Sequence, residues 1–225
     1  MAPGLAPDWR GGRKSEKKLK PPRRVAPQGL NFPNDGVNKT IGENLLSDQH
    51  SRSALWPVLT KIDTDLAAQV RAQGCGCGGT LHRANYPRKV RGMKEDAKRD
   101  SFCCEREGCR RRTTPESVRF LGRRVYAGFI VVLLTALRHG LTPGRVTALQ
   151  EQVGVDRRTL ERWRVWWREH FVRSASWRTE RGRFVPPPEE ATLPWSLWQR
   201  FDASRSPLLD LLRFLRPWST RAAPA

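Results

Sequence analysis

Apolar residues three and four positions apart predict a helix over residues 51–73. The apolar face of this helix would be formed by Leu59, Ile62, Leu66 and Val70. Pro57 can break the helix, and Gly74 is expected to end it. The preceding residues, 25–48, are rich in proline and glycine and predict an irregular linker.

Three further helices are predicted after residue 120. Residues 123–139 include the apolar run AGFIVVLLTAL, which is too short to span a bilayer and predicts a buried helix stopped by Gly140. Thr142 and Pro143 are typical of the start of a second, short helix that runs to about Gln152. Its inward side chains would be Val146, Leu149 and Val153.

The third of these helices carries most of the functional information. Gly154 and Val155 predict a turn, and Asp156 is a suitable N-cap for a helix from Arg157 to about Val172. The 3.6-residue period places one apolar, mostly aromatic stripe on the inner face, made of Leu160, Trp163, Trp167 and Phe171. The outer face is mainly basic and comprises Arg157, Arg158, Arg162, Val165 and Arg173.

Such a helix suits a helix-turn-helix that reads the major groove, because the inner stripe anchors it while the basic face meets DNA. We expect DNA contacts from Arg157, Arg158, Arg162 and Val165. The alternative is a solvated basic face in which Glu161 and Glu169 pair with arginines. Trp166 lies off the inner stripe and is expected to face a partner or nucleic acid.

The five cysteines are clustered and odd in number, which favours a metal site over disulfides. Cys75 and Cys77 precede a strand-like stretch, and Cys104 and Cys109 follow the predicted hairpin. Two cysteine pairs at the ends of a hairpin are typical of a zinc ribbon, in which Zn²⁺ supplies much of the folding energy.

The ligand set has alternatives. One residue separates the first cysteine pair and four separate the second, whereas two is the commoner spacing. Cys104 is preferred to Cys103 because it shares a strand face with Phe102. His82, on the first predicted strand, could replace a cysteine, although an isolated histidine in a basic strand is more often a surface residue.

A formal net charge of +20 and a pI of about 11.1 favour a polyanionic partner. The alternative is that these arginines are solvated surface residues whose abundance reflects the composition of the genome. Basic residues gather in the ribbon and in residues 1–24, a stretch too polar to fold alone. The candidate DNA contacts in these two regions are Arg110, Arg111, Arg112, Lys17, Lys18, Arg23 and Arg24.

The run GVDRRTLERW (154–163) resembles the turn and recognition helix of bacterial transposase and resolvase-type helix-turn-helix domains. Together with the cysteine ribbon, residues 75–171 resemble the DNA-recognition head of zinc-ribbon insertion-sequence transposases. The resemblance implies zinc ligation by the four cysteines and DNA contact by Arg157, Arg158 and Arg162. The cysteine spacing departs from that pattern. About fifty residues follow Phe171, too few for the RNase-H-like nuclease domain of such enzymes.

The expected fold is mainly α with a small β zinc ribbon. The expected divisions are a flexible basic arm and linker (1–48), a helix plus ribbon (49–116), a helix-turn-helix (117–175) and a Pro/Trp-rich linker with C-terminal helices (176–225). The leucine-rich stretch 207–215 is apolar nearly all round, so it must be buried in this chain, in a homodimer or against another protein.

We expect a non-enzymatic, duplex-DNA-binding protein of mobile-element origin, accessory to a recombinase or transposase, or a transcriptional regulator. The sequence shows no catalytic constellation, signal peptide or membrane span, which suggests a bacterial cytoplasmic, nucleoid-associated location. One alternative is an RNA-binding ribonucleoprotein component that uses exposed tryptophans to stack bases. Another is one subunit of a DDE-type transposase or nuclease.

Overall fold

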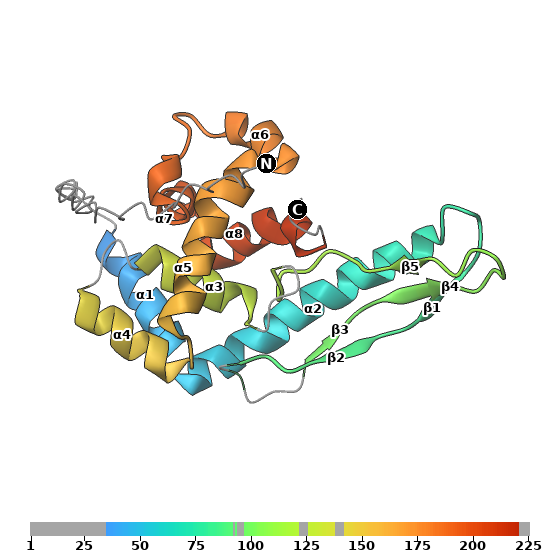
Figure 1. Cartoon of the computed structure of the whole chain (residues 1–225), viewed down its shortest axis with the longest axis horizontal. Coiled ribbons are helices and arrows are strands. Elements are labelled where there is room, and N and C mark those ends of the chain that lie inside the picture. The colour runs from blue at the N-terminus through green and yellow to red at the C-terminus, as the bar shows by residue number, and fades with distance from the viewer. Residues whose placement is uncertain (1–34, 92, 94–96, 122–125, 138–141, 221–225) are drawn as a thin grey trace, which may run out of the picture. The chain divides into compact units, whose positions relative to one another are not determined.

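The computed structural model describes residues 35–91, 93, 97–121, 126–137 and 142–220, with side chains from residue 41 onward. Lys17, Lys18, Arg23 and Arg24 lie outside the described residues. The described part is mainly helical with two small antiparallel sheets, as expected (Figure 1). The helices are α1 (Asp35–Ser47), α2 (Gln49–Gln73), α3 (Gly128–Leu137), α4 (Pro143–Gln152), α5 (Arg157–Val165), α6 (Ala175–Glu180), α7 (Trp195–Trp198) and α8 (Pro207–Leu215). A π-helical segment, Trp166–Phe171, continues α5, and short 3₁₀ turns occupy Arg181–Arg183, Glu190–Thr192, Gln199–Phe201 and Arg216–Ser219.

The strands form one interrupted hairpin with an added edge. They are β1 (Leu81–Arg83), β2 (Tyr86–Arg88), β3 (Ala97–Arg99), β4 (Phe102–Cys104) and β5 (Arg112–Thr113). β1 pairs with β4 with Leu81 opposite Cys104, and β2 pairs with β3 with Tyr86 opposite Arg99. β5 adds to β4 with Thr113 opposite Phe102 and Arg112 opposite Cys103.

The predicted linker over residues 25–48 is wrong in its last part, which forms α1. This helix packs against α3, α2 and α4. Leu46 is fully buried, and a Cβ at Gly42 would lie 3.1 Å from Trp198 and 3.2 Å from Leu133. Burial against the apolar α3 therefore outweighs the weak local preference of this stretch for helix.

Helix α2 runs unbroken through Pro57, contrary to the predicted break. Its N-cap is Asp48, whose carboxylate accepts the N–H groups of His50 and Ser51. Pro57 lies on the exposed side of the helix, so the backbone bond that it removes faces solvent. The buried stripe is also rotated from the predicted face and consists of Arg52, Trp56, Leu59, Asp63 and Ala67.

The main core surrounds α3, every residue of which is buried. The predicted inner face of the α4–α5 unit is confirmed, since Val146, Leu149, Val153 and Leu160 are buried. The predicted helix over 123–139 begins late, because Tyr126 and Ala127 make β-bridges to Arg91 and Phe120. The remaining positions of that prediction (123–125, 138 and 139) lie outside the described residues.

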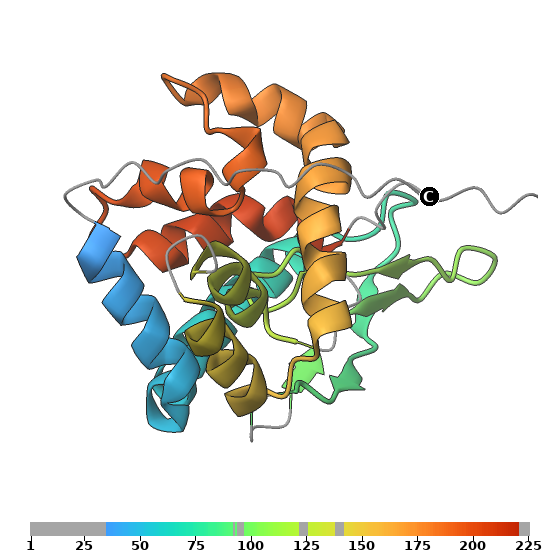
Figure 2. The ribbon, with the colours of Figure 1, turned by 60° about the vertical axis from the view of Figure 1, so that its left-hand side comes forward.

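The C-terminal segment belongs to this core instead of forming a linker. Trp177, Leu197 and Trp198 are at most 1 % exposed. Helix α8 buries Leu208, Leu211, Leu212 and Leu215 and contacts α7 and α3. Of the three predicted ways to cover α8, packing within the chain is therefore the one observed, and it sets α6 to α8 beside α5 (Figure 2).

Candidate metal centre and nucleic-acid interface

The first cysteine pair lies in a tight turn at the end of α2. Gly74 caps the helix with φ +72°, a conformation that favours glycine. The turn closes with the Cys75 N–H donating to the Gly79 carbonyl (3.0 Å) and the Gly78 N–H donating to the Cys75 carbonyl (2.8 Å). The thiols of Cys75 and Cys77 are therefore presented by the same short loop.

The second pair brackets the turn between β4 and β5. Cys104 ends β4, and its N–H donates to the Arg111 carbonyl at 3.0 Å. The Cys109 and Arg110 N–H groups both donate to the Arg106 carbonyl, with Gly108 at φ +83°. Antiparallel pairing of β1 with β4 then carries this turn to the first one.

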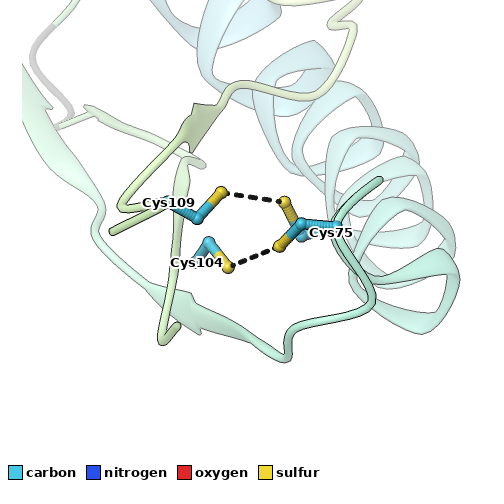
Figure 3. Close-up of side chains that lie close together, drawn as sticks. Cys75, Cys104 and Cys109 are labelled. Atoms are coloured by element: carbon cyan, nitrogen blue, oxygen red, sulfur yellow. Dashed lines mark hydrogen bonds between the residues drawn. The ribbon is translucent and has the colours of Figure 1, made fainter. Parts of the chain in front are cut away.

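The four predicted ligands, Cys75, Cys77, Cys104 and Cys109, converge, with all four sulfurs within 4.8 Å of one another (Figure 3). The Cys75 and Cys109 sulfurs are 3.8 Å apart, and those of Cys77 and Cys104 are 3.5 Å apart. The edge of a tetrahedron with metal–sulfur bonds of about 2.3 Å is about 3.8 Å, so the spacing fits one metal ion. Disulfide sulfurs would lie at about 2.05 Å. In the part of the chain that the structure describes, this is the one group of three or more His, Cys, Asp or Glu side chains so placed.

Backbone N–H groups point at these sulfurs. The Gly79 N–H donates to Cys77, whose pKa falls to about 6, chiefly because that bond stabilises the thiolate. The Arg106 and Arg111 N–H groups donate in the same way to Cys104 and Cys109. Burial raises the pKa of Cys104 to about 12. A cation at the centre would favour the thiolate at every one of these positions.

The two alternative ligands lie elsewhere. The Cys103 sulfur is 3.5 Å from the Arg110 carbonyl oxygen and 3.7 Å from that of Cys104, outside the cluster. His82 is exposed, and its Nε2 lies 2.9 Å from a Glu105 carboxylate oxygen. The strand alternation that favoured Cys104 is thus observed: Phe102 and Cys104 are buried, and Cys103 is half-buried.

A small apolar cluster supports the cysteine end of the hairpin. Ala67 from α2 meets Leu81, Phe102, Cys75 and Cys104, with Val70 partly buried against them. Gly79 is buried there, and a Cβ in its place would lie 2.7 Å from the Cys104 sulfur. The sulfur cluster therefore requires glycine at this position for space.

The predicted ribbon arginines differ in what they contact. Arg110 and Arg111 are exposed, and among the described residues their guanidinium groups have no hydrogen-bond or ion-pair partner. Arg112 bonds the Ala84 carbonyl (2.6 Å) and the Ser101 hydroxyl (2.8 Å), and its guanidinium lies over the Tyr86 ring. Arg112 therefore holds the sheet together, which weakens its case as a DNA contact.

The α4–α5 unit has the predicted caps and turn. Thr142 caps α4, and Asp156 caps α5 through the Thr159 N–H at 2.6 Å. Gly154, in the four-residue turn between the helices, has φ +65°. Its carbonyl accepts from the Tyr126 hydroxyl at 2.7 Å, and that hydroxyl also receives a bond from Arg91 of the ribbon at 3.4 Å.

The candidate DNA-contacting residues of α5 are not equally accessible. Arg157 and Arg158 are exposed in its first turn, and among the described residues neither side chain has a partner. Arg162 is exposed but donates to the Thr159 hydroxyl at 2.8 Å. Val165 is half-buried.

The inner face of α5 and of its π-helical continuation is packed as predicted. Trp163, Trp167 and Phe171 are at most 3 % exposed, and Trp163 meets Tyr126 edge-on at 5.1 Å. Trp167 also donates to the Thr135 hydroxyl at 3.1 Å. The α-helix ends at Val165, seven residues before the predicted end, and passes into the π-helical segment. Trp166 is partly buried against Trp167 and Phe171, so it is less available to a partner than predicted.

Sequence reasoning missed the buried polar centre that joins the ribbon to the core. Asp63 on α2 accepts from Arg119 Nε (2.7 Å), the Val118 N–H (2.7 Å) and the Ser117 hydroxyl. Arg119 also donates to the Lys98 carbonyl of β3 at 3.1 Å. The one sequence signal was a charged residue inside the apolar stretch Val118–Leu121.

Comparison with protein-family models, with curated proteins and with solved structures gave no match. Within the described residues, no helix is both long and apolar enough to cross a membrane.

Proposed function

We propose that Cys75, Cys77, Cys104 and Cys109 bind one structural Zn²⁺ ion and so form a zinc ribbon. Four thiols at tetrahedral spacing are a donor set that Zn²⁺ prefers, and a closed four-sulfur site leaves no position for a substrate. The ribbon cluster has only a few apolar residues, so metal binding would supply much of its folding energy.

We further propose that the protein binds duplex DNA through a helix-turn-helix formed by α4 and α5. The observation that carries this proposal is the unpartnered, exposed arginine pair, Arg157 and Arg158, in the first turn of a helix locked from behind by Leu160, Trp163 and Trp167. In helix-turn-helix proteins, the N-terminal residues of the second helix meet the base edges. A four-residue turn containing glycine between two short helices also agrees with that motif.

The biological role that suits these parts is DNA recognition by a protein of mobile-element origin. In this role the protein either assists a separately encoded recombinase or transposase or regulates transcription. Its place of action would be the nucleoid in the bacterial cytoplasm. Base stacking by tryptophans, the basis of the RNA-binding alternative, has less support. Trp56, Trp163, Trp167, Trp177, Trp198 and Trp218 are buried.

The zinc assignment is tested by metal analysis and chelator titration. Cys104→Ser is expected to lose the metal and unfold the ribbon, whereas Cys103→Ser keeps both, because the Cys103 sulfur points out of the cluster. Equal metal content in the two variants would refute the ligand set.

The DNA assignment is tested by selection from a random duplex library at about physiological salt, where nonspecific phosphate binding is weakened. We expect an enriched motif that Arg157→Gln/Arg158→Gln relaxes. The matched control, Arg178→Gln/Arg205→Gln, removes the same charge from exposed positions outside α5 and the ribbon and leaves the motif intact. Tighter binding of RNA than of duplex DNA at equal salt would refute the DNA assignment.

A further inference from the structure

The hairpin has two functionally different ends. At one end, where Leu81 pairs with Cys104, the four cysteines gather. At the other end, beyond the pair Arg88–Ala97, the hairpin docks on the helical core. Val90 and Ala97 are buried in the main core, and Arg91 bridges to Tyr126.

The docked end also reaches the start of α5. Arg91 donates to the Tyr126 hydroxyl, which in turn donates to the Gly154 carbonyl just before the Asp156 cap. Arg157 and Arg158 directly follow Asp156 in the sequence, so they lie near the docked end of the hairpin. Arg110 and Arg111 lie in the turn at the metal end.

The length of the hairpin sets the distance between these arginine pairs. From Leu81 to Arg91 the chain advances at most about 33 Å, at about 3.3 Å per residue. The section of α2 alongside, from Trp56 in the main core to its cap at Gly74, spans about 27 Å at 1.5 Å per residue. Figure 1 shows α2 running along the hairpin, and the Asp63–Arg119 pair fastens that helix to the segment that follows β5. Arg119 also donates to the Lys98 carbonyl of β3, so this pair ties α2 to the hairpin and supports the spacing.

We propose that a single DNA duplex contacts both arginine pairs at once, about one helical turn apart. Successive turns of B-DNA repeat every 34–36 Å or so, close to the length of the hairpin plus the reach of the arginine side chains. Arg157 and Arg158 meet base edges, and Arg110 and Arg111 bind phosphates one turn away on the same side of the duplex. This inference rests on the proposed DNA binding and adds a second contact point that supplies affinity without sequence choice.

The test uses the full-length, metal-loaded protein and the motif obtained by selection. Duplexes carry that motif with flanks of about 5 or about 15 base pairs, shorter and longer than one turn. We expect tighter binding to the long-flank duplex and a hydroxyl-radical footprint with two protected patches about one turn apart. Arg110→Gln/Arg111→Gln should erase the distal patch and the gain from the long flank while keeping the motif and the metal. Its salt slope, d log K/d log[salt], should fall by about 1.8, since each phosphate contact contributes about 0.9.

Each outcome separates this inference from the function on which it rests. One protected patch, or a flank effect that survives in Arg110→Gln/Arg111→Gln, would overturn the two-point contact and leave DNA binding standing. Failure to bind any duplex would instead remove the proposed function. Arg178→Gln/Arg205→Gln, with the same loss of charge, must keep both patches, because a general charge effect would weaken binding in both variants alike.

Discussion

The Asp63–Arg119 pair should be the most sensitive polar contact in the protein, and Asp63→Asn is the change that probes it. The Asp63 side chain is 1 % exposed and that of Arg119 is 5 % exposed. The arginine lies over the rings of Trp56 and Phe120, at 5.5 and 5.2 Å from their centres. The neutral amide keeps the size of the carboxylate but leaves the buried guanidinium with only Asp100, at 3.4 Å, as an opposing charge.

Removing one partner of a buried ion pair costs roughly 3–5 kcal/mol. The free energy of unfolding should fall by that amount, because Asp63 accepts three hydrogen bonds at once. With a urea m-value of roughly 2–3 kcal/mol/M for a chain of this size, the unfolding midpoint should drop by about 1–2.5 M. Amide exchange in β3 should also rise, since Arg119 holds the Lys98 carbonyl.

Asp65→Asn is the matched control, with the same chemical change two residues further along the same helix. Asp65 is 57 % exposed and pairs only at the surface with Lys61, which is 77 % exposed. Its loss should cost no more than about 0.5 kcal/mol. Equal midpoints for the two variants in urea unfolding would refute the view that the buried pair fastens the ribbon to the core.

Two further predictions concern the metal end of the hairpin. Gly79→Ala should weaken metal binding roughly tenfold to a hundredfold in chelator competition, because the new methyl group would displace the Cys104 sulfur. Gly76→Ala, with nothing within 4 Å of its added carbon, should bind metal normally, and equal affinities would disprove the crowding argument. The pKa of Glu105 should lie at about 2, since hydrogen bonds from His82 and Thr80 stabilise its carboxylate. Its contribution to stability is therefore complete above the unfolded value of about 4.3 and is lost as the pH falls towards 2. Carbon-13 NMR titration would contradict this if the midpoint stays near 4.3.

Interactions between neighbouring residues were sufficient to predict the helix caps, the strand alternation and the aromatic stripe of α5. Asp156 and Thr142 cap their helices because a carboxylate or hydroxyl can reach an N–H three residues ahead. Strand alternation placed Phe102 and Cys104 on one face and Cys103 off it. The aromatic stripe of α5 followed from the helical period in the same way.

Features that depend on distant partners could not be predicted in this way. The first segment of the described chain looked like a linker and became α1 because α3 offers it a wholly buried apolar surface. Asp63, which carried no prediction from the sequence, is buried because Arg119, far along the chain, neutralises it. The C-terminal tryptophans entered the core for the same kind of reason, since Trp177 and Trp218 both pack on Phe171.

The candidate site likewise combines features set by neighbouring residues with features set by distant ones. The sequence by itself determined which residue types were present, namely four thiols near glycine turns and an arginine pair after a helix cap, because these depend on spacing within a few residues. Only the tertiary structure decided that the thiols meet within 4.8 Å and that Arg112 is engaged in the sheet. It also decided that Tyr126 links Arg91, at the docked end of the hairpin, to Gly154 in the turn before α5. Those outcomes depend on strand pairing and burial between residues far apart in the chain, where contacts with distant residues outweigh local preference.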